Sequence, residues 1–120
     1  MKNLTLKREL LDGYIDIYNP KEKFNSFSAA ITPKSKEDMT YVASLAYKEM
    51  SKREQDIEFA KSVERELSLK VKTHICPYVN NHCKCIITNT LYDIIKIDYN
   101  KDKDELYLYL EEVGKIESTP

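Results

Sequence analysis

The sequence predicts a mainly β protein of the α+β class, a small antiparallel β-barrel or sandwich of about five to six strands with one α-helix. Apolar and polar residues alternate in several short segments of the chain, and turn residues separate these segments. Helical spacing of apolar residues occurs in one stretch near the middle. At 120 residues the chain has the length of a single domain. We expect a core from about 12–18 and 40–114, a long flexible loop at 19–39 and a tail at 115–120.

The first third of the chain has few regular patterns. Residues 1–11 fit either a helical turn or an extended segment, whereas 12–18 alternate as a strand that the Asn19-Pro20 pair would end. The 19–39 segment is the least periodic part, with a short strand expected near 27–31. Strand pattern returns at 40–47.

A helix is expected from about Lys52 to Val63. Ser51 and Glu54 have the spacing of a capping box, in which each side chain binds the backbone amide of the other residue. Ile57 and Ala60, extended by Phe59 and Val63, supply an apolar stripe behind this start.

The remainder of the chain alternates in the manner of an antiparallel meander. A tight Asn89-Thr90 turn and a charged turn at 100–104 separate the last segments. The expected strands are 65–73, 83–88, 92–98 and 105–113.

Composition and charge exclude several classes of function. The 19 Lys and Arg residues nearly balance 20 Asp and Glu residues, so no overall positive field exists to attract nucleic acid. No apolar run approaches the roughly 18–20 residues of a membrane-spanning helix, and no signal peptide follows the basic start. With an odd number of cysteines, three, an intracellular, reducing location is expected. Two glycines are too few for a phosphate-binding loop or a dinucleotide fingerprint.

A group of soft ligands at 74–85 raises the alternative of a zinc site. Its candidates are Cys76, His82, Cys83 and Cys85. Thiolate and imidazole groups suit tetrahedral zinc, but the single residue between Cys83 and Cys85 does not match the usual ligand spacing. The other interpretation makes the cysteines small apolar core residues and the histidines surface residues. We therefore predict no metal and no cofactor.

Catalysis is not expected. His82 and Cys83 are neighbours on a strand and would point to opposite faces, and the carboxylate pairs Glu37-Asp38 and Glu111-Glu112 look like solvated charges. The sequence therefore predicts that the protein is not an enzyme.

Tyrosines are the most prominent aromatic residues. Tyr107 and Tyr109 share one strand face, and Tyr14 and Tyr18 share another. Such faces can stack single-stranded bases or bind protein partners. Because no cluster of Lys and Arg accompanies them, a partially buried core edge or a protein interface is the better interpretation.

The order of elements from Thr40 onward resembles that of the phage head-closure (head–tail joining, or stopper) proteins. The matching segments are an alternating strand at 41–47, a helix start at Ser51-Lys-Arg-Glu54, a strand at 67–71, a turn segment at 86–94 and a final strand at 105–112. Thr90 stands where this family has a turn glycine.

The resemblance implies a small β-barrel with one helix that assembles as a ring with copies of itself. Its partners would be portal-adaptor and tail-completion proteins, with packaged DNA nearby in the channel and no membrane contact. The expected location is the virion connector, after assembly in the host cytoplasm. The 49–64 segment would correspond to the channel-facing or ring-forming region, whose charged residues are Glu49, Lys52, Arg53, Glu54, Asp56 and Glu58. A solvated helix face is the other interpretation of these charges.

Three hypotheses therefore follow from the sequence. The first is a non-catalytic connector component that closes the DNA channel and offers a surface for tail attachment. The second is a small phage-encoded inhibitor that binds a host enzyme through a strand edge or a tyrosine face. The third is a zinc-binding nucleic-acid module built around 74–85.

Overall fold

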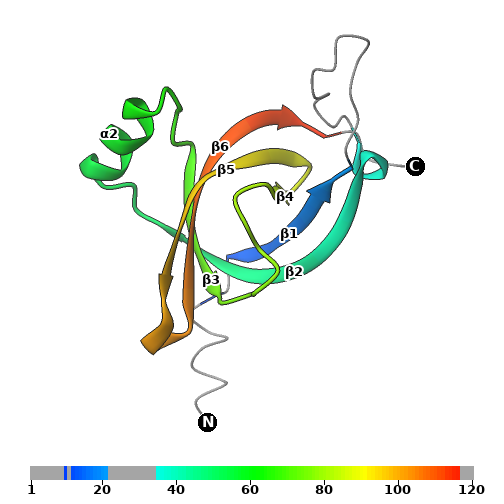
Figure 1. Ribbon diagram of the computed structural model, residues 1–120, viewed down its shortest axis with the longest axis horizontal. Coiled ribbons are helices and arrows are strands. Elements are labelled where there is room, and N and C mark those ends of the chain that lie inside the picture. Colours follow the sequence, from blue (N-terminus) through cyan, green and yellow to red (C-terminus); the bar gives the residue numbers. More distant parts are fainter. Residues whose placement is uncertain (1–9, 11, 22–34, 117–120) are drawn as a thin grey trace.

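A computed structural model describes residues 10, 12–21 and 35–116 of the chain. Its six strands form one antiparallel sheet that closes into a barrel in the order β1-β2-β3-β6-β5-β4, with helix α2 outside the ring of strands (Figure 1). The predicted fold class is therefore confirmed. The strands are β1 (Gly13–Pro20), β2 (Met39–Met50), β3 (Leu69–His74), β4 (Lys84–Ile87), β5 (Thr90–Asn100) and β6 (Glu105–Lys115). The helices are α2 (Glu54–Ser62) and the short 3-10 turns η1 (Lys36–Asp38) and η2 (Lys101–Lys103).

The chain forms two simple meanders, one from β1 to β3 and one from β4 to β6. Strand β3 pairs with β2 and β6, although β4 is the next strand along the chain. The segment between β3 and β4 therefore has to cross the ring, as Figure 1 shows. Cys76 and Val79 of this segment belong to the core, so the crossing also fills the barrel interior.

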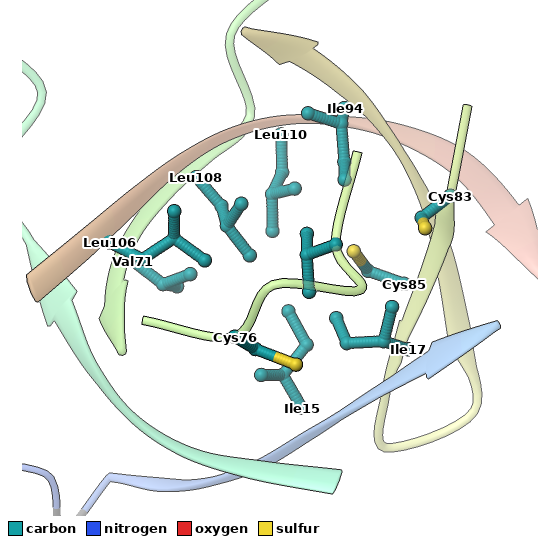
Figure 2. Close-up of a cluster of buried hydrophobic side chains, with 11 residues drawn as sticks. Ile15, Ile17, Val71, Cys76, Cys83, Cys85, Ile94, Leu106, Leu108 and Leu110 are labelled. Atoms are coloured by element: carbon teal, nitrogen blue, oxygen red, sulfur yellow. The ribbon is translucent and has the colours of Figure 1, made fainter. Parts of the chain in front are cut away.

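Alternation along the strands produces the core of the barrel. Side chains in the central parts of β1, β3 and β6 point alternately inward and outward, and six of the inward ones have no measurable solvent exposure. Figure 2 shows them converging with Cys76 of the β3–β4 segment and Cys85 of β4. Burial of branched aliphatic side chains supplies most of the stabilising free energy of such a core. The six fully buried aliphatic residues of β1, β3 and β6 are Ile15, Ile17, Val71, Leu106, Leu108 and Leu110.

Several element boundaries differ from the predicted ones. Strand β1 continues through Pro20, which pairs with Met39 at the strand end, where the missing proline N–H is tolerated. Strand β2 extends to Met50, whereas the strand expected at 65–73 begins at Leu69. The 19–39 loop is shorter than predicted because β1 and η1 take part of it. The strand expected near 27–31 lies outside the described residues, as does the tail after residue 116. Residues 1–11, expected to be a helical turn or an extended segment, also lie outside them except for Leu10.

The tight turn between β4 and β5 is formed by Thr88 and Asn89, one residue earlier than predicted. Both residues have positive φ, at 45° and 63°, as in the type I′ turn that matches the twist of a hairpin. Thr90 already belongs to β5 and pairs with Ile87. The strained position is therefore Thr88, because a β-branched residue rarely adopts this conformation.

Replacing Thr88 with asparagine is expected to stabilise the protein by about 1 kcal/mol, because asparagine tolerates positive φ at this turn position. Chemical denaturation monitored by circular dichroism would measure the change. Thr40→Asn, at an exposed position in β2, is the control and should not stabilise the protein. An unchanged or lower denaturation midpoint for Thr88→Asn would contradict the assignment of strain to Thr88.

Candidate functional site

The outer faces of β2, β3, β6 and β5 together carry a surface of alternating basic and aromatic side chains. Val71 and Leu108 point into the core, so the residues on either side of them point outward. Strand register then arranges the outward residues in rows across the sheet. The first row is Met50, Lys70, Tyr109 and Lys96, and the second is Lys48, Lys72, Tyr107 and Asp98.

Helix α2 covers the first of these rows. Ala60 of the helix packs with Leu67 and Tyr109 in a cluster separate from the barrel core, and each of the three is at most 6% exposed. Ile57 adds to this contact as predicted, whereas Phe59 and Val63 are 40% and 48% exposed. The stripe that docks the helix is therefore narrower than the sequence suggested.

The helix begins two residues later than the capping-box pattern predicted. Arg53 occupies the N-cap, and the Asp56 carboxylate accepts a hydrogen bond from the Arg53 amide at 3.0 Å. Neither Ser51 nor Glu54 lies at the predicted place, because Ser51 precedes the cap and Glu54 is the first helical residue. The Asp56 side chain is therefore both a helix cap and part of the helix–barrel contact.

Asp56 is held in a nearly buried ion pair. Its Oδ2 lies 3.0 Å from Lys70 Nζ, and its Oδ1 lies 3.3 Å from Arg53 Nη2. Asp56 and Lys70 are only 4% and 6% exposed. Burial alone would raise the pKa of Asp56, but the hydrogen bonds from Arg53 and Lys70 outweigh it and lower the pKa to about 2. Two cations thus share one carboxylate, which leaves an excess of positive charge at this point.

Tyr109 connects this ion pair to β5. Its hydroxyl donates a hydrogen bond to Asp98 Oδ2 at 2.9 Å, and Lys70 and Lys96 lie 5.1 Å and 4.6 Å from its ring centroid. Burial and the Asp98 carboxylate both raise the pKa of Tyr109, so it stays a neutral phenol that keeps its proton and donates a hydrogen bond. Lys96 lies 3.5 Å from Asp98, so the charge of that carboxylate is balanced locally.

A groove of about 600 Å³ lies beside the start of α2. Arg53 and Tyr99, both about half exposed, and the half-buried Tyr107 line it together with Asp98, whereas Tyr109 among the lining residues is only 3% exposed. Its volume falls in the range of small-molecule and peptide side-chain sites. Positive charge beside aromatic surface suits the binding of an acidic or aromatic group. We call this feature the Tyr107 groove; its lining is Met50, Ser51, Arg53, Lys70, Asp98, Tyr99, Tyr107 and Tyr109.

The charged residues predicted for the channel or assembly segment separate into two groups. Asp56 is buried in the ion pair described above, contrary to the expectation of a solvated charge. The exposed residues are Glu49, Lys52, Arg53, Glu54 and Glu58. One charged residue of this segment therefore attaches α2 to the barrel, and the other five are exposed to solvent.

The four tyrosines predicted as a partner interface also differ in exposure. Tyr14 is 70% exposed and Tyr107 is half-buried, whereas Tyr18 and Tyr109 are buried. Tyr18 packs edge-to-face against Tyr41, with ring centroids 5.7 Å apart. Only Tyr14 and Tyr107 of these four thus have the exposure that contact with a partner requires.

The four candidate zinc ligands do not gather into a metal site. Cys76, Cys83 and Cys85 are buried free thiols, whereas His82 is exposed. Figure 2 shows the Cys76 and Cys85 sulfur atoms among the aliphatic side chains of the core. Across the described residues, no three His, Cys, Asp or Glu side chains form a group that could hold a metal ion. The zinc alternative therefore loses its structural basis, and the cysteines act as small apolar core residues.

The native thiols are expected to resist modification. Burial raises the pKa of Cys85 and of Cys83, so little reactive thiolate forms at neutral pH. An Ellman titration should therefore detect few thiols in the native protein and three in denaturant. Rapid reaction of all three thiols in the native protein would contradict their burial in the core.

Sequence reasoning missed the groove because its residues come from distant segments. Lys70, Asp98 and Tyr99 were not singled out, although Lys70 and Lys72 flank the apolar Val71 in an alternating strand. That alternation places both lysines on the outer face and was the available signal. Which residues would lie opposite them depends on the pairing of β3 with β6.

None of the helices in the described portion of the chain has the length and apolar character required to cross a membrane. No protein-family model matches the sequence, and comparison with curated proteins finds no significant match.

Proposed function

We propose that this protein is a non-catalytic structural component of a tailed-phage connector, of the head-closure type. It assembles as a ring under the portal adaptor, closes the DNA channel and provides a surface for tail attachment. Its partners are copies of itself, the portal adaptor and tail-completion proteins. Its location is the virion connector, after assembly in the host cytoplasm.

One observation carries this proposal. The chain leaves the barrel after β2, forms α2 on the outside and returns at β3 (Figure 1). The resemblance in the sequence implies that the channel-facing or ring-forming region lies at this connection, on a small barrel with one helix. Lys52, Glu54 and Glu58 are exposed there and can contact water, DNA or a neighbouring subunit.

The mechanism we propose is steric. In a closed barrel each strand pairs with a neighbour on both sides, so no strand edge is free to pair with another copy. Contacts between copies must therefore use outward side chains and connecting segments. Exposed tyrosines suit such contacts because they add large rigid surface at a low entropic cost. Tyr14, Tyr41 and Tyr99 are each more than 50% exposed.

Negative-stain imaging of the purified protein, alone and mixed with the portal–adaptor complex of its own phage, tests the proposal. Rings of this chain seated on the adaptor are the expected result. If the protein binds no component of the connector, the proposal is wrong.

The Tyr107 groove also favours a second candidate, a small phage-encoded inhibitor of a host enzyme. A groove of this size can hold a single segment of a target protein. An inhibitor should form a complex of fixed stoichiometry with one host enzyme. Affinity capture followed by size-exclusion chromatography would detect that complex, and Arg53→Gln should weaken it.

A further inference from the structure

Strand β1 and the residue before it carry an acidic and aromatic surface that is separate from the lining of the Tyr107 groove. In the closed strand order, β1 lies three places from β6 in either direction. Ile15 and Ile17 point into the core, so Tyr14 and Asp16 point outward from β1. Asp12 is also exposed immediately before the strand, where its Oδ2 accepts a hydrogen bond from the Glu49 amide of β2 at 2.7 Å. We call Asp12, Tyr14 and Asp16 the Tyr14 face.

The two surfaces are complementary in charge and in chemistry. Arg53 and Lys70 share the single Asp56 carboxylate, so the groove wall keeps an excess positive charge, whereas Lys96 balances Asp98. The Tyr14 face offers two carboxylates beside a phenol ring that is 70% exposed. A phenol ring can stack on the aromatic lining of the groove while a carboxylate approaches Arg53.

We propose that the Tyr14 face of one copy of this chain docks into the Tyr107 groove of the next copy. The inference rests on the self-assembly proposed above and identifies the two surfaces that would form it. The contact joins two different surfaces of the chain and is therefore heterologous, so its repetition generates a ring when the rotation closes. A two-fold contact between two grooves would instead bring two positive walls together.

A complementation experiment with two variants tests this interface. Tyr14→Ser removes the docking ring, and Tyr99→Glu places a negative charge in the groove at a position that is 53% exposed. Sedimentation velocity should show that each variant alone self-associates about tenfold more weakly than the wild type. An equimolar mixture should form heterodimers and nothing larger, because the intact groove of one variant accepts the intact Tyr14 face of the other.

Two further variants distinguish loss of the interface from misfolding and from indirect effects of substitution. Asp16→Arg reverses charge on the Tyr14 face and should behave as Tyr14→Ser does. Tyr78→Ser is the matched control, because Tyr78 is 71% exposed but belongs neither to the lining of the groove nor to the Tyr14 face. It should associate as the wild type does, and circular dichroism should show the same fold for all variants.

The outcomes separate this interface from the connector function. If wild type and both interface variants form equal rings on the portal adaptor, the function stands and the interface is wrong. If the wild type ignores the adaptor but the mixture of variants still forms heterodimers, the interface stands and the function is wrong. Wild-type chains that stay monomeric up to about 1 mM, and form no ring on the adaptor, would overturn both.

Discussion

Replacing Asp56 with alanine is expected to lower the free energy of unfolding by about 3–4 kcal/mol, because it leaves the buried Lys70 ammonium without its partner. Lys70 is 6% exposed and lies between α2 and the outer face of the barrel. The same substitution removes the hydrogen bond that caps the Arg53 amide. We therefore expect α2 to loosen before the barrel unfolds.

Urea denaturation of the variant measures this loss, and hydrogen exchange in α2 reports the local effect. Glu58→Ala is the matched control, because Glu58 lies on the exposed side of the same helix and should cost less than about 0.5 kcal/mol. The double variant Asp56→Ala with Lys70→Met should recover much of the lost stability, since it no longer buries an unpaired charge. A double variant as unstable as Asp56→Ala would contradict this explanation.

The same ion pair sets an acid limit on stability. The pKa of Asp56 falls from an ordinary value of 3.8 to about 2 in the folded protein. A carboxyl with a lowered pKa adds stability at pH values above its unfolded pKa and loses it as pH falls through the folded pKa. The contribution of Asp56, about 2 kcal/mol, should therefore disappear between about pH 4 and pH 2. In the Asp56→Asn variant this part of the pH dependence should be absent.

The strands of the second half of the chain could be predicted because alternation with period two is local. In 105–110 every second residue is a leucine, and the structure places Leu106, Leu108 and Leu110 in the core. The charged turn before that strand was also predicted, and Asp104 adopts the left-handed conformation there. The local sequence was enough to predict a strand wherever one face of that strand is apolar and the other is polar.

Features that depend on distant pairing could not be predicted. Ser51 with Glu54 and Arg53 with Asp56 have the same spacing, and the choice between them follows from Lys70, which lies on β3. Tyr109 looks like an exposed strand tyrosine in the sequence, but α2 covers it. Nothing local indicates where a short helix docks or that β3 pairs with β6. The Tyr107 groove depends on both of these arrangements.

Replacing Leu108 with alanine is expected to destabilise the protein by about 3–4 kcal/mol, through lost burial and the cavity left behind. Leu108 has no measurable exposure and lies between Val71 of β3 and Ile97 of β5. Urea denaturation measures the change, and Val113→Ala on the same strand is the control, because Val113 is 42% exposed and its substitution should cost less than about 1 kcal/mol.

Strand β6 contributes to the core through Leu108 and to the groove through the neighbouring residues Tyr107 and Tyr109. At temperatures where it remains folded, Leu108→Ala should therefore associate with other copies as the wild type does. A loss below about 1 kcal/mol would mean that this part of the core is not close-packed, and the rigid barrel assumed for assembly would no longer hold.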